Sequence, residues 1–148
     1  RPDRIVVGEV RDGAALDMLQ AMNTGHDGSL TTVHANSPTD ALSRLETMSM
    51  MAGMELPMAA IRDQVARAVN LIVQQTRMRD GSRRITAITE VVGVEHGEIR
   101  LQDLFLFHYN RDRDSAHLGE LVATGSQPHF LQLLEQRGVH LDKSVFKK

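Results

Sequence analysis

The stretch IVVGEVRDGAALDMLQAMNTGHDGSLTTVHANSP, residues 5–38, decides the fold class. It begins with three branched apolar residues in a row, which are typical of a strand buried on both faces in a parallel sheet. An amphipathic helix is predicted over residues 14–23, and Gly25 is placed to end it. A second strand is predicted over residues 29–34, before a helix that takes Ser37 as its N-cap. Strands and helices that alternate in this way indicate an α/β domain with a largely parallel sheet.

The remainder of the chain predicts further helices and then a change to antiparallel strands. Aspartate followed by glycine at residues 80–81 is a tight-turn signal between two apolar runs, which favours a hairpin at the edge of the sheet. The predicted elements are helices from residue 38, from Pro57 and over 128–137, strands at 71–73, 85–94 and 99–107, and a loop at 110–115. The expected division is an α/β core over residues 1–76, an antiparallel meander over 77–109, and a loop with a short helix over 110–148.

Composition narrows the classes of protein to which the chain can belong. It has 148 residues, no cysteine and no apolar run long enough to span a bilayer, so no membrane insertion is expected. The absence of cysteine excludes disulfides and thiolate metal sites. With 17 basic and 19 acidic side chains and 3% aromatic residues, the chain lacks the basic excess and stacking surfaces typical of nucleic-acid-binding proteins. Because the chain opens with Arg1 and has no signal-peptide pattern, we expect residue 1 to be a cut within a longer protein.

Three side chains in the opening stretch are candidates for chemistry. Glu9 follows the first predicted strand, where phosphoryl-transfer enzymes place an acid that orients a magnesium-bound or attacking water. The alternative is that Glu9 merely begins a surface loop. His26 and His34 flank the second strand and could each reach a bound phosphate, although isolated histidines also serve as surface or capping residues. The run at residues 25–29 could present backbone N–H groups to an anion or form an ordinary helix-to-strand turn.

Taken together, these residues resemble the signature of the type II/type IV secretion ATPases. The strand that ends in Gly8 and Glu9 is similar to the Walker B element of that family, and residues 24–37 are similar to its histidine box. The sequence ANS at residues 35–37 most resembles the branch of the tight-adherence (Flp) pilus motors. The resemblance continues through Asp40, Ala41, Leu42, Arg44, Leu45, Ile88, Thr89, Glu90, Gly125, Pro128, Phe130 and Leu131, and so covers nearly the whole chain.

The resemblance implies the carboxy-terminal part of a RecA-like P-loop NTPase core that lacks the half with the phosphate-binding loop and carries an antiparallel strand extension. It implies ATP and magnesium as cofactors, a ring of six identical subunits, and partners in a pilus or secretion platform at the cytoplasmic face of the inner membrane. Glu9 and His34 would be the catalytic residues: Glu9 would activate or position the attacking water and His34 would sense or contact the nucleotide, while magnesium would be reached near Glu9 only through water. The other nucleotide-associated residues would be His26, Arg11, Gly25, Gly28 and Thr32.

Departures from the family pattern leave other functions open. The phosphate-binding loop Gly-x-x-x-x-Gly-Lys-[Ser/Thr] and the acidic box of the family are absent from these residues, so we expect them not to hydrolyse ATP alone. Ala14 stands where the family commonly has glutamate. One alternative function is a non-catalytic assembly module with a degenerate P-loop fold. Another is a nucleic-acid motor of the RecA-like group, against which the net charge of -2 weighs.

Overall fold

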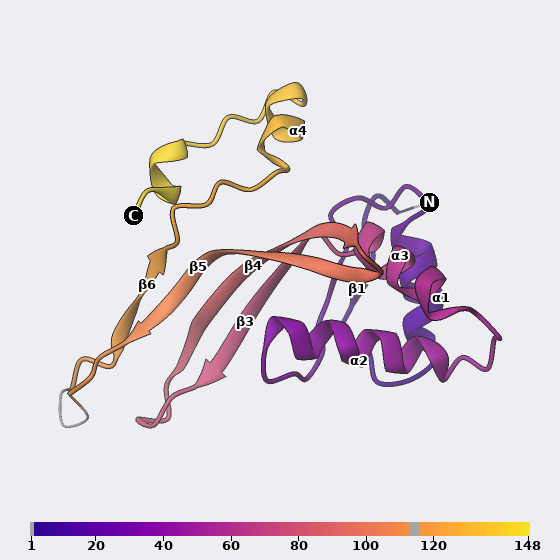
Figure 1. Cartoon of the computed structure of the whole chain (residues 1–148), viewed down its shortest axis with the longest axis horizontal. Coiled ribbons are helices and arrows are strands. Elements are labelled where there is room, and N and C mark those ends of the chain that lie inside the picture. Colours follow the sequence, from indigo (N-terminus) through magenta and orange to yellow (C-terminus); the bar gives the residue numbers. More distant parts are fainter. Residues whose placement is uncertain (1, 113–115) are drawn as a thin grey trace. The chain divides into compact units, whose positions relative to one another are not determined.

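The computed structural model describes residues 2–112 and 116–148, which divide into two compact units (Figure 1). Arg1 and residues 113–115, the latter part of the loop predicted at 110–115, lie outside the described residues. The first unit comprises the chain up to Asn70 together with residues 93–100, and the second comprises residues 71–92 and 101–148. Among the described residues, no helix has both the length and the apolarity needed to cross a membrane.

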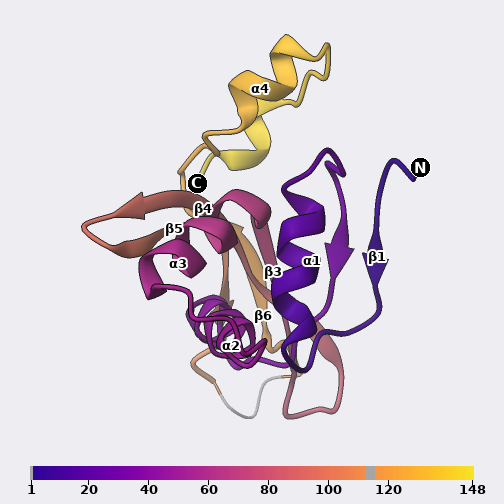
Figure 2. The ribbon, with the colours of Figure 1, turned by 90° about the vertical axis from the view of Figure 1, so that its right-hand side faces the viewer.

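The first unit contains two short parallel strands and three helices. Its elements are β1 (Val6–Val7), α1 (Ala14–Met22), β2 (Leu30–Thr31), α2 (Pro38–Met50) and α3 (Met58–Ala68). The two strands lie side by side in Figure 2, with Val6 opposite Leu30. The helices pack on one another, and burial of each large apolar side chain between them contributes about 1.5–3 kcal/mol. The most deeply buried of these side chains are Leu16, Leu19, Ile61 and Val65.

The start of α2 is fixed by its own sequence. The Ser37 side-chain oxygen accepts a hydrogen bond from the Asp40 N–H at 3.1 Å, and the Asp40 carboxylate accepts one from the Asn36 N–H at 2.8 Å. The two bonds resemble a capping box, except that the donor bound by Asp40 belongs to Asn36, the residue before the N-cap. Pro38 occupies the first helical turn, where its missing N–H costs nothing. The direction in which α2 leaves the segment before it is set by these contacts.

Arg62 of α3 joins the helices to a hairpin tip within the first unit. Its Nε donates to Glu46 Oε1 of α2 at 3.1 Å. Its Nη1 donates to the Gly97 carbonyl at 2.5 Å and to Glu98 Oε1 at 2.9 Å. The side chains of Arg62 and Glu46 are only 24% and 15% exposed, so this part of the network is largely shielded from water. A guanidinium suits three acceptors because it carries five N–H donors in a rigid plane.

The second unit is built on an antiparallel sheet whose strands follow the order β3-β4-β5-β6. Its elements are β3 (Leu71–Arg77), β4 (Arg83–Glu95), β5 (Glu98–Tyr109), β6 (Gly119–Ala123), α4 (Leu131–Gln136) and the 3-10 helix η1 (Lys143–Phe146). The tip of the β4–β5 hairpin, residues 93–100, belongs to the first unit. The two long strands therefore pass from one unit into the other.

Glu90 is a buried carboxylate in the second unit, only 3% exposed. It accepts hydrogen bonds from the backbone N–H groups of His129 at 3.0 Å and Phe130 at 3.2 Å. The Nδ1 atom of His129 also lies 3.0 Å from the Glu90 carboxylate. A buried charge is tolerated only when hydrogen bonds replace its hydration. These contacts hold the segment that precedes α4 to strand β4.

The predicted α/β class is confirmed, but the arrangement of the strands differs from the prediction. Only β1 and β2 pair in parallel among the described residues, so the expectation of a largely parallel sheet is wrong for them. The strand predicted at 71–73 runs to Arg77 and pairs antiparallel with β4, because the tight turn that follows returns the chain beside it. Strand β6 was not predicted, and the helix predicted over 128–137 is confirmed only over α4. The boundaries expected after residues 76 and 109 stay predictions.

Candidate functional site

Parallel pairing of β1 and β2 brings Glu9 and His34 to the same edge of the sheet. Glu9 lies two residues beyond β1 and His34 three residues beyond β2, and the carboxyl ends of parallel strands point the same way. The pairing extends past the strands, since the Val10 N–H donates to the Thr32 carbonyl at 3.1 Å. The Thr32 hydroxyl also donates to the Gly8 carbonyl. These bonds fix the register of the two segments that carry the candidate residues.

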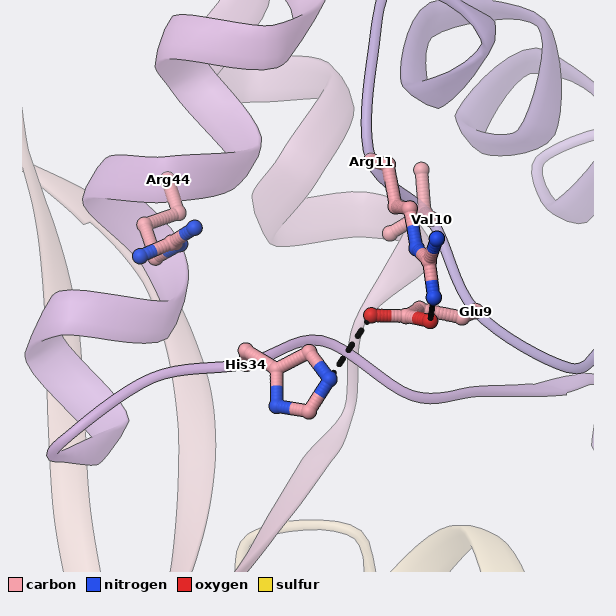
Figure 3. A pocket seen from close by; sticks show the side chains of 5 residues that line it. All are labelled: Glu9, Val10, Arg11, His34 and Arg44. Atoms are coloured by element: carbon pink, nitrogen blue, oxygen red, sulfur yellow. Dashed lines mark hydrogen bonds and ion pairs between the residues drawn. The ribbon is translucent and has the colours of Figure 1, made fainter.

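Both carboxylate oxygens of Glu9 have a partner. Oε2 accepts a hydrogen bond from the Arg11 guanidinium, and Oε1 lies 2.8 Å from Nε2 of His34. Figure 3 shows the carboxylate between these two side chains, with a dashed line to each. The Glu9 side chain is 21% exposed, whereas those of Arg11 and His34 are 77% and 84% exposed. The carboxylate is thus sheltered while its two partners stay accessible to solvent.

The hydrogen bond from Arg11 is the largest of the causes that hold the pKa of Glu9 below its ordinary value. Partial burial acts in the opposite direction, and the charges of Arg11 and His34 add to the lowering. Glu9 is therefore ionised at neutral pH. An ionised carboxylate of low pKa is a good acceptor for a water molecule or a metal-bound water but a weak general base.

A pocket of about 340 Å³ opens beside this carboxylate. It is lined by Glu9, Val10, Arg11, His34 and Arg44. Figure 3 shows that Arg44 comes from the adjoining helix, on the opposite side of the pocket from Arg11. Within residues 2–112 and 116–148, no group of three histidine, aspartate or glutamate side chains is arranged to hold a metal ion.

The other sequence-predicted site residues lie outside the lining of this pocket. The Nδ1 atom of His26 is 2.8 Å from the Ala21 carbonyl near the end of α1, which is a helix-capping contact. Gly25 and Gly28 have φ values of 86° and 80°, a left-handed conformation that favours glycine. Thr32 borders the site through its bond to Gly8. Their association with a nucleotide, like the catalytic roles of Glu9 and His34, stays a prediction.

Arg44 is a pocket residue to which the sequence analysis gave no role. The signal that could have found it is its helix, which starts at Pro38 directly after the segment that carries His34. Leu42 and Leu45 on either side of it in sequence are buried, whereas Arg44 is exposed. A charged residue on the flank of a helix that begins at a candidate site is a candidate member of that site.

Comparisons with known proteins place this arrangement in a family. The family model described as Type II/IV secretion system protein matches residues 1–103. A putative conjugal transfer protein of Mycobacterium tuberculosis is 40% identical over 124 residues, which are 82% of this chain and 34% of that protein. The conjugal transfer protein TrbB of Rhizobium radiobacter is 39% identical over 118 residues, 80% of this chain and 33% of that protein.

A solved structure extends the likeness to the fold. The VirB11 ATPase from the Brucella suis type IV secretion system, determined in complex with sulphate, is 33% identical with a TM-score of 0.55. The match covers 60% of this chain and 27% of that one. The chain spans about a third of the length of the curated relatives named above. The fold is that of a P-loop NTPase, and the chain belongs to the type II/type IV secretion ATPase family.

Proposed function

We propose that this chain is part of a motor ATPase that couples ATP hydrolysis to protein secretion or pilus assembly. The observation that carries the proposal is the Glu9 carboxylate, which is ionised and sheltered, lines a pocket, and is held by Arg11 and His34. Family membership supports it, because the relatives include a VirB11 ATPase and conjugal transfer proteins. A carboxylate at this position after a strand orients water for attack in phosphoryl-transfer enzymes.

The chemistry of the pocket fits the phosphate end of ATP with its magnesium ion. Magnesium, when bound, neutralises charge on the phosphate oxygens. Glu9 accepts a hydrogen bond from a metal-bound or attacking water, and the contacts from Arg11 and His34 keep its carboxylate in one orientation. The proposal includes a nucleotide-associated role for His26, Gly25, Gly28 and Thr32, which lie on the chain segment between α1 and His34.

The assembly that we propose is a hexameric ring at the cytoplasmic face of the inner membrane. It would act on the platform proteins of a secretion or pilus machine. The sequence ANS at residues 35–37 favours the tight-adherence pilus among these machines, whereas the relatives named above are conjugal transfer and type IV secretion proteins. Deletion of the gene, scored for pilus formation and for DNA or protein transfer, separates the two.

A second candidate function is a non-catalytic assembly module with a degenerate P-loop fold. In P-loop enzymes the backbone amides and lysine of a Gly-x-x-x-x-Gly-Lys-[Ser/Thr] loop hold the nucleotide phosphates, and the 148 residues contain no such loop. Absence of the loop from the intact protein as well would favour the assembly module over the motor. In either case we expect these residues, purified alone, to show no magnesium-dependent ATP hydrolysis.

The test uses the intact protein that contains this chain. Glu9→Gln keeps the shape of the side chain and removes its charge, so we expect nucleotide binding to persist while turnover falls by about 100-fold or more. His34→Ala should also reduce turnover, because Glu9 then loses one of its two partners. The matched control is Glu55→Gln, an exposed glutamate outside the pocket, which should leave the rate unchanged. Intact protein that neither binds nor hydrolyses ATP would favour the assembly module, whereas a Glu9→Gln variant with full turnover would refute the catalytic role of Glu9.

A further inference from the structure

The inference concerns Arg44, which lines the candidate pocket from the middle of α2. Its guanidinium lies across the pocket from Arg11, and no dashed line reaches it in Figure 3. In the described part of the chain, the side chain of Arg44 makes no hydrogen bond and no ion pair. An exposed arginine without a partner is common on protein surfaces. Arg44 differs from such residues because the acidic side chains near it are engaged by other partners.

The residue best placed to pair with Arg44 is engaged elsewhere. Asp40 lies four positions before Arg44 on α2, the spacing at which an acid and a base on a helix form an ion pair. The Asp40 carboxylate instead accepts a hydrogen bond from the Asn36 N–H at 2.8 Å, just before the N-cap of α2. The helix therefore does not neutralise its own arginine on this face.

The carboxylate inside the pocket is engaged as well. Glu9 uses one oxygen for Arg11 and the other for His34, at 2.8 Å. The pocket thus contains two guanidinium groups and a single carboxylate, and His34 adds positive charge when it is protonated. This balance leaves a net positive charge that an anion would neutralise. Guanidinium groups suit phosphate in particular, since their parallel N–H donors match two of its oxygens.

We propose that Arg44 is a phosphate-binding residue of this pocket, where its guanidinium and that of Arg11 bind the oxygens of one phosphoryl group next to Glu9. The inference rests on the proposed function only in naming phosphate as the anion. Arg11 can take part without leaving Glu9, because a guanidinium has five donors and only Nη2 contacts the carboxylate. The phosphoryl group is either the terminal group of a nucleotide or free inorganic phosphate, which share the same oxygens.

The test is a titration of the 148-residue chain with inorganic phosphate at low ionic strength, followed by NMR of the arginine Nε–H groups. We expect a saturable shift of the Arg44 signal, and a loss of phosphate affinity of about tenfold or more in Arg44→Gln. Arg44→Lys should retain part of the affinity, because it keeps the charge but not the paired donors. The matched control is Arg67→Gln, an exposed arginine of α3 that pairs with Asp63 at 3.1 Å, and its affinity should equal that of the wild type.

A second titration, of the intact protein with ADP and with a non-hydrolysable ATP analogue, identifies the source of the phosphoryl group. If only the analogue loses affinity in Arg44→Gln, the residue binds the terminal group of the nucleotide. If phosphate alone loses affinity, it binds free phosphate. The proposal is overturned if the chain shows no saturable shift, or if Arg44→Gln and the wild type bind all these ligands equally. Neither result changes the rate expected for Glu9→Gln, so this failure and that of the proposed function are distinguishable.

Discussion

Removing the Glu90 carboxylate should release the segment that precedes α4. In Glu90→Ala the backbone N–H groups of His129 and Phe130 lose their acceptor, and both bonds are to a charged group. Hydrogen bonds of this kind contribute about 1.5–3 kcal/mol each. Because the His129 side chain is 61% exposed, water can reach part of this segment, so the lower end of the range applies. The two bonds together then amount to about 3 kcal/mol.

Amide hydrogen exchange at His129 and Phe130 reads out this change directly. A loss of about 3 kcal/mol corresponds to exchange that is roughly 100-fold faster at these two positions. Glu90→Gln keeps one carbonyl oxygen as an acceptor, so we expect a smaller increase, about tenfold. The matched control is Glu120→Ala, an exposed glutamate of β6, which should leave both amides unchanged.

Two results would refute this reasoning. If the two amides exchange equally fast in Glu90→Ala and in the wild type, the carboxylate does not hold the segment. If every amide of the second unit becomes faster by the same factor, Glu90 stabilises the whole unit and not the segment before α4. Urea unfolding monitored by circular dichroism measures independently how much the substitution lowers the free energy of global unfolding.

Two further predictions concern the first unit. Ser37→Ala should lower the free energy of unfolding by about 1 kcal/mol in urea denaturation, because the Asp40 N–H loses its cap. Ser37→Asp should retain most of the stability of the wild type, because its carboxylate can accept the same hydrogen bond. If Ser37→Ala is as stable as the wild type, the cap contributes nothing. The pairing of Glu9 with Arg11 should stabilise the folded chain above the pKa that Glu9 has when unfolded, and this contribution should vanish as the pH falls through its lower folded pKa. In Arg11→Gln the pKa of Glu9, followed by carboxyl carbon NMR, should rise toward its ordinary value, and an identical titration in both proteins would rule out Arg11 as the cause.

Elements with local signals could be predicted from the sequence, and elements that depend on distant partners could not. Ser37 and Pro38 predict the start of α2, and the helix begins at Pro38 in the structure. Strand β6 has only five residues and forms by pairing with β5, so nothing within its own sequence marks it strongly. The hairpin of β3 and β4 was predicted from the local turn signal at residues 80–81 and is confirmed by their antiparallel pairing, whereas the extent of β3 to Arg77 was not predicted.

The same distinction between local signals and distant partners applies to the residues of the candidate site. The positions of Glu9 and His34 followed from the two strands that carry them, and their contact through a 2.8 Å distance agrees with the parallel pairing. Arg44 could not be assigned in this way. Its place at the pocket depends on how α2 packs against the rest of the first unit, and helix packing is not visible in a pattern of single residues.

The path of the β4–β5 hairpin has a consequence for how the molecule can be divided. The chain passes between the two units at residues 70–71, 92–93 and 100–101, so no single peptide bond separates them. A protease that cuts once, after any residue from 71 to 99, yields two fragments, neither of which contains a whole unit. A truncation that ends before Gly97 also removes from Arg62 two of its three acceptors. Any continuous stretch of the sequence that contains all of one unit therefore also contains part of the other, so neither unit can be obtained by itself as a single stretch.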